Sequence, residues 1–398
     1  MLFFYLLSYF GKSEYLIDQC VAPLNLPKPL ENGTLLQVQV IIRHGARTPG
    51  EDFHDSATTQ KWYCDVLDSH SPRLNPAPVK FFRNYRDEFD ERLIKYKPTC
   101  REKDLLTLGM NQHFELGQAY KKLYYEKMNF LPKNINPSFF FARASESDRT
   151  LRSAISFIQG MFPPASPNEV IPLVTDNKAA GLMHPKDKWC KKLKGSVEYM
   201  HKTEKFKTFF KDFSDKHQKQ YENEVSGDWN PSRVKKFCSW VVMTQCTGHQ
   251  IPTNISQDLQ TDCMTLVNYH QFMQHDNDKY KGIASSPFFR EMFRIADNLI
   301  TSEEHYKFVL FSSHDTALAA FLDTLGYNYH DKSAIQVRSH LAFELWEIDG
   351  SVYSRYVFNG EPIKIPFLNN KTLFQYAMLK GEMARLGYLN HCFIPEWD

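Results

Sequence analysis

The chain has 398 residues, of which 42% are hydrophobic and 24% charged, and its formal net charge is +2. This composition is typical of a folded globular protein, and the near-balance of charge argues against a nucleic-acid binder, which usually carries a strong basic stripe. The length exceeds the size at which a single core usually stops growing, so we expect a main domain with a second subdomain or a large insertion.

The N-terminus begins with an apolar stretch over residues 1–10. It is too short to span a bilayer, and no later stretch reaches the length of a membrane helix. It resembles the apolar region of a signal peptide but lacks the positive segment in front, so a cleaved signal, a truncated signal, an anchor and an apolar strand on the body all stay open. We treat residues 1–33 as a signal-like segment and lead-in.

Residues 35–42 predict a strand rich in β-branched residues, and the run Arg43–Pro49 follows it directly. His44 would therefore lie at the carboxyl end of a strand, where open α/β sheets bind their ligands. Arg43 and Arg47 flank it with guanidinium groups, which match phosphate oxygens and stay charged at any working pH. Taken alone, the run also fits a surface charge cluster.

Residues 50–102 show no sustained period, which is typical of a long excursion over the strand edge. Apolar residues at helical spacing then predict a helix over 104–126 that serves packing. A buried strand is predicted over 137–142, followed by Arg143, and the polar start of 145–160 predicts the next helix. The arginine therefore repeats the position of the histidine, a charged residue at the carboxyl end of a strand.

A weaker strand is predicted over 171–175. Beyond it the pattern becomes charged and helical, and it contains four of the eight cysteines. We expect residues 181–285 to form an inserted, mainly helical cap. The α/β core would comprise residues 34–180 and 286–398, and its second part would open with a helix near 286–300.

Residues 308–313 predict a further buried strand, which delivers His314 and Asp315 to its carboxyl end before a helix over 317–325. Three predicted strands therefore end in residues that suit phosphate binding or acid–base chemistry. Two more strands are predicted to form a hairpin, 341–348 and 352–358.

Eight cysteines occur without any C-x-x-C pair. Zinc sites normally need close Cys or Cys/His spacing, so a disulfide framework is the better interpretation, with a pairing that the sequence does not determine. N-glycosylation sequons begin at Asn32, Asn254 and Asn370. Together these signals predict a secreted or luminal glycoprotein, with the lysosome and the Golgi as candidate compartments.

We predict that residues from the three strand ends converge on one site: Arg43, His44, Arg47, Arg143, His314 and Asp315. The arginines would hold the non-bridging oxygens of a phosphate group. Neutral His44 would attack phosphorus and form a phosphohistidine, while protonated Asp315 gives its proton to the leaving oxygen and His314 donates a hydrogen bond to the phosphate. This scheme needs no metal ion or other cofactor. It predicts an acidic optimum, because a bound phosphate dianion favours the protonated acid.

The run Arg43–Pro49 and the pair His314 and Asp315 resemble the R-H-G-x-R-x-P and His-Asp motifs of the histidine acid phosphatase family. Further segments are similar to the family's, 106–117, 143–154 and 160–164. The resemblance runs over about 34–175 and about 305–360, and several ordered motifs make chance similarity a poor explanation.

The resemblance implies an α/β fold: a three-layer phosphoglycerate-mutase-like core with a mostly parallel sheet, plus an inserted, mainly helical cap. It implies that His44 accepts the phosphoryl group and that Asp315 is the proton donor. The implied phosphate pocket consists of Arg43, Arg47, Arg143 and His314. Arg149 would instead be structural, a salt-bridge residue on its helix. Family members are often dimers, so a homodimer is expected.

The resemblance therefore implies a metal-independent phosphoric monoester hydrolase that acts on a small-molecule, glycan or lipid phosphate monoester. Within the family, residues 343–346 and 358–360 are most similar to the branch of 2-phosphoxylose and lysophosphatidic acid phosphatases, with lysosomal or prostatic-type acid phosphatases as the alternative. Thr316 after the His-Asp pair departs from the His-Ala-Glu form of inositol polyphosphate phosphatases, which argues against a phytase-like role.

Two other function classes stay open. A phosphomutase or phosphotransferase shares the core, but mutases of this type are typically cytosolic, which the sequons and cysteines disfavour. A non-catalytic ligand-binding member is the other alternative, although a site without catalysis would have no need of Asp315.

Overall fold

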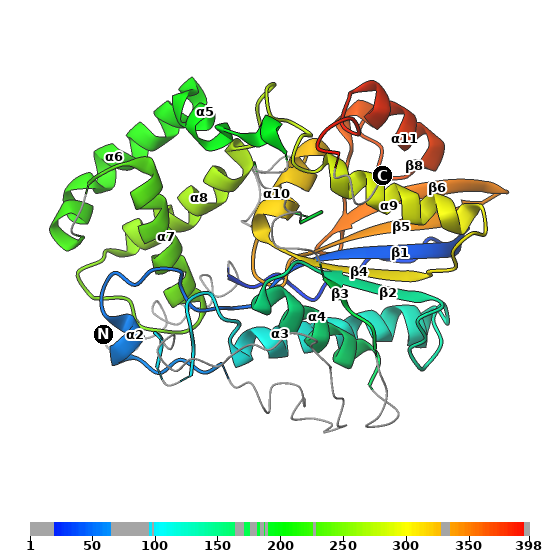
Figure 1. The fold of residues 1–398 in the computed structure, drawn as a ribbon, viewed down its shortest axis with the longest axis horizontal. Helices are drawn as coiled ribbons and strands as arrows, with labels where there is room; N and C mark the ends of the chain where they lie inside the picture. The colour runs from blue at the N-terminus through cyan, green and yellow to red at the C-terminus, as the bar shows by residue number, and fades with distance from the viewer. Residues whose placement is uncertain are drawn as a thin grey trace, which may run out of the picture.

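The computed structural model describes residues 20–64, 95–97, 99–163, 171–175, 181–183, 187, 190–225, 228–327 and 335–393. The signal-like stretch at 1–10 and most of the excursion predicted over 50–102 lie outside these residues. The described chain folds around one β-sheet with helices packed against it (Figure 1). The predicted α/β class is therefore confirmed.

The central sheet is mixed. Its strands are β1 (Thr34–Arg43), β2 (Phe140–Ala144), β3 (Val174–Thr175), β4 (Phe308–Ser313), β5 (His340–Ile348), β6 (Ser351–Phe358), β7 (Glu361–Pro362) and β8 (Phe374–Gln375). Their order is β3-β2-β4-β1-β5-β6-β7, with β8 paired to β6. The half from β3 to β1 is parallel, whereas the predicted hairpin of β5 and β6 adds an antiparallel half. The prediction of a mostly parallel sheet is therefore wrong, because the half of the sheet beyond β1 is antiparallel.

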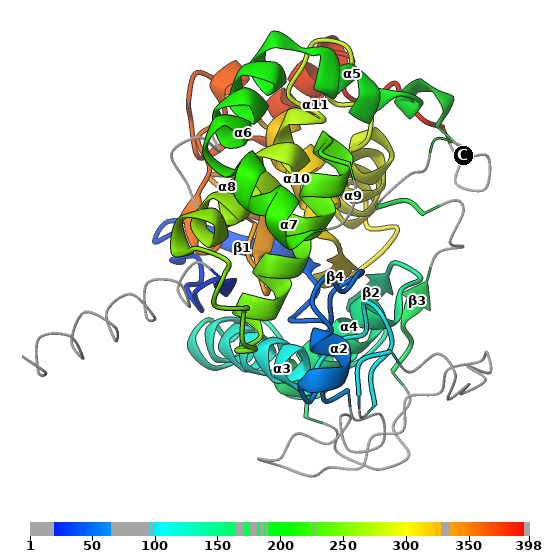
Figure 2. The same ribbon diagram turned by 90° about the vertical axis from the view of Figure 1, so that its left-hand side faces the viewer.

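Helices cover both faces of the sheet and the end at which β1 terminates. They are α2 (Ser56–Thr59), α3 (Thr107–Lys121), α4 (Asp148–Met161), α5 (Ser196–Lys202), α6 (Glu204–Glu224), α7 (Pro231–Cys246), α8 (Gln257–Met273), α9 (Ser286–Ile300), α10 (Asp315–Thr324) and α11 (Tyr376–Arg385). Figure 1 shows α3 and α4 on one face and α9, α10 and α11 on the other, which makes three layers. Helices α5 to α8 lie beyond the end of the sheet, in front of β1 and β4 in Figure 2.

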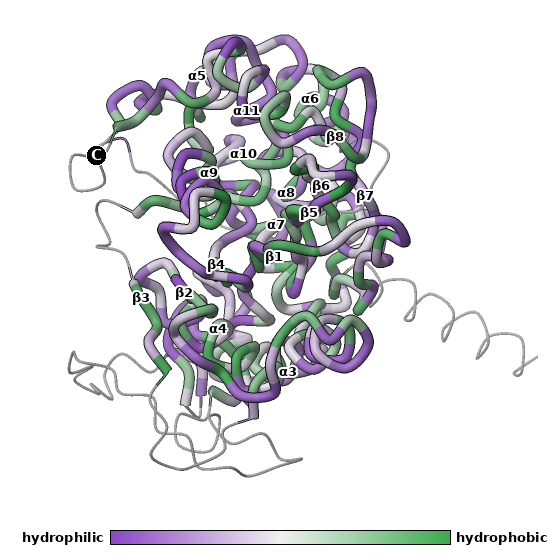
Figure 3. Tube along the Cα trace, turned by 90° about the vertical axis from the view of Figure 1, so that its right-hand side faces the viewer, coloured by the Kyte–Doolittle hydropathy of each residue, from purple (hydrophilic) through white to green (hydrophobic). Residues whose placement is uncertain are grey.

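Strand β1 runs through the centre of the core and is buried on both faces. Val38, Val40 and Ile42 pack toward α3 and α4, whereas Ile41 packs toward α9 and α10. Helices on both sides exclude water, which explains the near-continuous apolar run in its sequence. The outer helices are instead amphipathic: Figure 3 shows hydrophobic and hydrophilic stretches alternating along α3. Two layers of helix thus hold the carboxyl end of β1 in place.

The structure shifts three predicted boundaries. β2 continues to Ala144, so Arg143 lies inside the strand rather than after it. The helix predicted over 104–126 consists of α3 and a π-helical turn at Lys122–Lys127. The helix predicted from residue 145 begins at Asp148, which leaves Ser145 at the strand end. Helix α9 and strand β4 have the predicted bounds.

All eight cysteines pair, which confirms the predicted disulfide framework. The bonds are Cys20–Cys246, Cys64–Cys100, Cys190–Cys392 and Cys238–Cys263. Three of them involve α7, α8 or the segment leading to α5, so they tie the cap helices to each other and to the chain termini. Such bonds act by restricting the unfolded chain. In the part of the chain that the structure describes, no helix has the length and apolarity to cross a membrane.

Helices α5 to α8, which we call the helical cap, have an apolar interior of their own. Phe213, Val241 and Leu266 from three different helices belong to one buried cluster, and Trp240 lies in it as well. The boundaries predicted for the cap, 181 and 285, stay a prediction.

Candidate active site

The carboxyl ends of β1 and β4 bring the two predicted histidines together. The strands are parallel neighbours, with Arg43 opposite Ser313 in register. The residues that follow, His44 and His314, therefore lie side by side, with 5.7 Å between their ring centroids. Asp315 opens α10 and ion-pairs with Arg43, whose Nη2 lies 2.8 Å from Asp315 Oδ2. Four of the six predicted site residues thus meet at one edge of the sheet.

Helices α3 and α4 clamp the loop that follows His44. The Gly45 amide donates to Ser153 Oγ at 3.1 Å, and the Ala46 amide donates to Gln112 Oε1 at 3.0 Å. Gly45 also lies against Gly109, since a Cβ at Gly45 would fall 2.4 Å from the Gly109 carbonyl oxygen. Only glycine permits so close a contact between backbones. The loop is therefore held rigidly, and with it the imidazole of His44.

The hydrogen bonding of His44 defines its tautomer. Nδ1 lies 2.9 Å from the Gly45 carbonyl oxygen, which can only accept, so Nδ1 carries the proton and Nε2 has a free lone pair. Burial, followed by the positive charges of Arg149, Arg43 and Arg47, lowers the pKa of His44 well below its usual range. His44 is therefore a neutral imidazole whose Nε2 can act as a nucleophile.

The guanidinium groups of Arg43, Arg47 and Arg149 all act on this imidazole through their positive charge. Arg47 Nη1 donates to the Thr48 carbonyl oxygen at 2.8 Å, and Arg43 Nη1 donates to the carbonyl oxygen of Ile335. Burial and the neighbouring charge of Arg149 lower the pKa of Arg47 to about 9. Arginines that repel one another in a buried site are stabilised by an anion between them, so the geometry favours binding of a phosphate group.

Arg149 also lies at this site, beside the predicted arginines. Arg143 lies inside β2, where its Nη1 is 3.6 Å from Glu291 Oε1 of α9, and its place in the phosphate pocket stays a prediction. Arg149, expected to be structural, instead approaches His314, with 3.2 Å between its Nη2 and Nδ1 of the ring. The salt bridge expected on this helix is formed by Arg152 with Asp148, at 2.8 Å.

Both ring nitrogens of His314 lie within hydrogen-bond distance of a side chain, Arg149 of α4 and Ser145 before it. Its Nδ1 accepts from Arg149, because a guanidinium group can only donate. Nε2 then carries the proton, and it lies 2.8 Å from Ser145 Oγ. In this arrangement His314 orients Arg149, and a hydrogen bond from its ring to phosphate would require Nε2 to leave Ser145.

Asp315 is subject to opposing effects. Its burial raises the pKa, but the positive charges of Arg43 and Arg47 lower it more, and the resulting pKa lies well below its usual range. Without substrate the carboxyl group is therefore ionised. A dianionic phosphate beside it would offset the arginine charges and raise the pKa again, so the proton needed by an acid catalyst arrives with the substrate.

Several residues of the site carried no recognised sequence signal. Gln112 and Ser153 hold the loop amides but sit at ordinary helix positions. The positive charge of Lys235 on α7 contributes to the lowered pKa of Asp315. Arg149 had a usable signal, because it lies in the first turn of a helix that begins directly after a strand of the site.

The remaining predicted positions lie apart from this site. The sequon residues Asn32, Asn254 and Asn370 are all exposed. Within the described residues, no group of three or more His, Cys, Asp or Glu side chains is placed to hold a metal ion.

Comparisons with family models and with known proteins all point to one family. The model of the histidine phosphatase superfamily (branch 2) matches residues 34–359. Counting factor 60 of Dictyostelium discoideum is 24% identical over 358 residues, which cover 86% of this chain and 84% of that protein. 2-phosphoxylose phosphatase 1 of Xenopus tropicalis is 21% identical over 367 residues, covering 83% and 69%.

Solved structures agree on the fold. A phytase of Hafnia alvei in complex with tartrate superposes with a TM-score of 0.58 at 15% identity, covering 90% of this chain and 98% of the phytase. The phytase from D. castellii gives a TM-score of 0.57 at 14% identity, covering 96% of this chain and 87% of that chain. The chain belongs to the histidine phosphatase superfamily, branch 2, the family of the histidine acid phosphatases.

Proposed function

We propose that this protein hydrolyses phosphate monoesters through a phosphohistidine intermediate. The observation that carries the proposal is the free Nε2 of His44, set among Arg43, Arg47 and Arg149 with Asp315 beside them. A neutral nucleophile, a cationic phosphate pocket and a carboxyl group next to the leaving oxygen are the parts that such a reaction needs.

In the first step, Nε2 of His44 attacks phosphorus and forms a P–N bond while the ester P–O bond breaks. Protonated Asp315 gives its proton to the leaving oxygen, so the product departs as an alcohol rather than an alkoxide. In the second step, water attacks the phosphohistidine, Asp315 takes one of its protons, and the P–N bond breaks to release phosphate. Arg43, Arg47 and Arg149, together with the predicted pocket residue Arg143, stabilise the charge on the equatorial oxygens in both steps.

The residues of the proposed reaction bind the phosphate group, so the proposed substrate is a small-molecule, glycan or lipid phosphate monoester. The names of the relatives differ in this respect, since they include acid phosphatases, a 2-phosphoxylose phosphatase and a lysophosphatidic acid phosphatase. We propose a secreted or luminal glycoprotein, because four disulfides and exposed sequons at Asn32, Asn254 and Asn370 are typical of an oxidising compartment. A homodimer stays a prediction.

The proposal is tested by phosphate release from 4-nitrophenyl phosphate between about pH 3 and about pH 9, with a chelator present. We expect acidic activity that resists the chelator and is lost in His44→Ala. A phosphomutase would instead require transfer to a sugar phosphate acceptor. A non-catalytic member would release no phosphate while still binding phosphate analogues, and either result would overturn the proposal.

A further inference from the structure

Two helices of the cap share a small cavity with Arg43, the arginine that pairs with the proposed acid. The cavity has a volume of about 20 Å³, and its lining includes Arg43, Val242 of α7, Met264 and Asn268 of α8, and Ile335. A volume of this size is large enough for one water molecule. The cap therefore reaches a side chain of the phosphate site, although neither helix packs into the layers around the sheet.

Ile335 connects the cap to the guanidinium group of Arg43. Its amide donates to Asn268 Oδ1 of α8 at 3.4 Å, and its carbonyl oxygen accepts from Arg43 Nη1. The other terminal nitrogen of the same guanidinium group, Nη2, pairs with Asp315. Asn268, Ile335 and Arg43 are all more than nine-tenths buried, so water does not readily replace these contacts. Three successive contacts thus lead from α8 to the acid carboxyl group.

The segment that follows Ile335 is fastened to the cap at a second point. The Val337 amide donates to the Cys20 carbonyl oxygen at 3.1 Å. Cys20 forms a disulfide with Cys246 at the carboxyl end of α7. Both α7 and α8 therefore hold this segment, and a displacement of the cap would displace the carbonyl group that binds the arginine.

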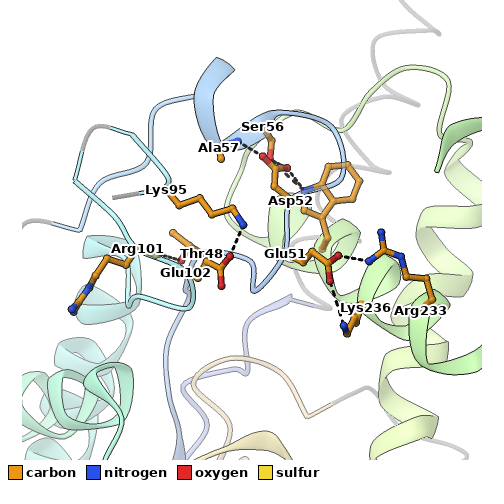
Figure 4. Close-up of polar contacts among 11 residues, drawn as sticks. Thr48, Glu51, Asp52, Ser56, Ala57, Lys95, Arg101, Glu102, Arg233 and Lys236 are labelled. Atoms are coloured by element: carbon orange, nitrogen blue, oxygen red, sulfur yellow. Dashed lines mark hydrogen bonds and ion pairs between the residues drawn. The ribbon is translucent and has the colours of Figure 1, made fainter. Parts of the chain in front are cut away.

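Helix α7 is itself fixed to the segment that follows Arg47. Figure 4 shows Glu51 pointing toward Arg233 of this helix, from whose Nη1 it accepts a hydrogen bond. Asp52 Oδ1 accepts from Trp240 Nε1 of the same helix at 3.0 Å. One end of the cap is thus anchored close in sequence to the second arginine of the phosphate site.

Helices α7 and α8 are joined to each other. The disulfide Cys238–Cys263 connects them, and both contribute side chains to the same buried apolar cluster. The pair of helices therefore spans from the segment after Arg47 to the contact with Arg43. This arrangement suits a brace that holds two phosphate-site arginines at a fixed separation.

We propose that Asn268 is a positioning residue for the phosphate site, which acts through Ile335 to fix the guanidinium group of Arg43 relative to the phosphate. The inference rests on the proposed function and adds the cap to the parts that the reaction needs. Without the Asn268 oxygen, the buried Ile335 amide loses its acceptor, which is costly, so the segment shifts to find another. The carbonyl group that holds the arginine moves with it. Hydrogen bonds from a guanidinium group to phosphate depend on geometry, so binding weakens.

A purely structural role for Asn268 makes a different prediction. An asparagine that only stabilises the fold would lower the free energy of unfolding when replaced, and the folded protein would keep its affinity for phosphate. A residue that acts through Arg43 must lower that affinity. The loss must also disappear when Arg43 is already absent, because two residues in one chain of contacts are not additive.

The experiment measures the Kd of inorganic phosphate by isothermal titration calorimetry on the full-length protein. In Asn268→Leu we expect the Kd to rise about tenfold, because a charge-assisted contact of Arg43 is weakened. Asn268→Ala removes the same acceptor without added bulk and should show the same loss. Asn268→Asp keeps an oxygen that accepts from the Ile335 amide and should retain most of the affinity.

Two further proteins complete the comparison. Gln271→Met is the matched control, because Gln271 lies on the same helix and lines the same cavity, and it should keep the wild-type Kd. In the Arg43→Ala background, Asn268→Leu should cause no further change in the Kd.

An unchanged Kd in both Asn268→Leu and Asn268→Ala overturns the inference. So does an equal loss from Asn268→Leu with and without Arg43, or a loss in Gln271→Met as large as that in Asn268→Leu. These outcomes leave the proposed function intact, since it depends on hydrolysis and not on Asn268. A wild type that binds phosphate but hydrolyses no ester overturns the proposed function alone, and one that binds no phosphate overturns both.

Discussion

Arg43 and Asp315 form a buried ion pair between two adjacent strand ends, with 2.8 Å between Nη2 and Oδ2. The pair links the residue before the nucleophile to the proposed acid. It also keeps that acid ionised until a phosphate dianion competes for the arginine. Acid catalysis in this site is therefore coupled to substrate binding.

Asp315→Asn tests this coupling. The amide cannot give a proton to the leaving oxygen, so we expect kcat for an alkyl phosphate to fall about 100-fold or more. The loss should be much smaller for 4-nitrophenyl phosphate, whose leaving group needs little protonation. Equal losses for both esters would contradict the assignment of Asp315 as the proton donor.

Truncation of Arg149 and of Arg143 should affect stability differently. Arg149→Ala removes a guanidinium group next to His44 and His314, so kcat/KM should fall about 100-fold or more while the fold is retained. Arg143 is predicted to bind phosphate and also lies 3.6 Å from Glu291, which keeps Arg294 as a second partner, so Arg143→Ala should lower kcat/KM about 100-fold and the free energy of unfolding by about 1 kcal/mol. Kinetics combined with urea unfolding of both variants checks the assignment. An unchanged kcat/KM in Arg143→Ala would remove this arginine from the phosphate pocket.

Arg143 and Arg149 also show where the sequence is sufficient and where it is not. The strand-then-turn pattern is local, and it correctly placed His44 and His314 at neighbouring strand ends. The same reasoning ended β2 at residue 142, whereas the strand continues by two residues to Ala144 and contains Arg143. The end of β2 is set by its pairing with β4, where Ala144 lies opposite Ser312, and a local pattern does not contain this contact.

Contacts between distant segments of the chain could not be predicted from local sequence patterns. The cysteine count predicted disulfides, but the pairing of Cys20 with Cys246 spans 226 residues and follows from tertiary packing. The attachment of α7 to Glu51 and Asp52, which follow Arg47 in the chain, likewise joins distant segments and carried no local signal.

Gly45 should not tolerate a side chain. A Cβ there would lie 2.4 Å from a backbone oxygen of Gly109, so Gly45→Ala must displace the loop that carries His44. We expect kcat to fall about 100-fold, since small misplacements of reacting groups are costly. Gly381→Ala is the matched control, because its Cβ would meet open space, and it should keep wild-type kcat. Normal kcat in Gly45→Ala would show that the loop is less constrained than this contact requires.

Asp323 of α10 should make the protein more stable in acid. Its Oδ2 is buried without a hydrogen-bond partner among the described residues, and burial raises its pKa to about 7. The folded state therefore holds a proton that the unfolded state loses near pH 4, so this contribution to stability is complete below about pH 4 and is lost as the pH rises to about 7.

Urea unfolding at about pH 5 and at about pH 8 measures this effect. The wild type should lose stability between the two conditions, whereas Asp323→Asn should lose less and should be the more stable protein at the higher pH. An identical pH dependence in both proteins would show that Asp323 is ionised in the fold.

The central claim is that His44 carries the phosphoryl group, and trapping the phosphoenzyme tests it most directly. Protein mixed with an aryl phosphate is quenched within one turnover, digested and analysed by mass spectrometry under alkaline conditions, where phosphohistidine survives. We expect the mass of one phosphoryl group on the peptide that contains His44, a stronger signal in Asp315→Asn as hydrolysis slows, and none in His44→Ala. Phosphate release without any phosphorylated histidine, or with the label on another residue, would contradict the mechanism.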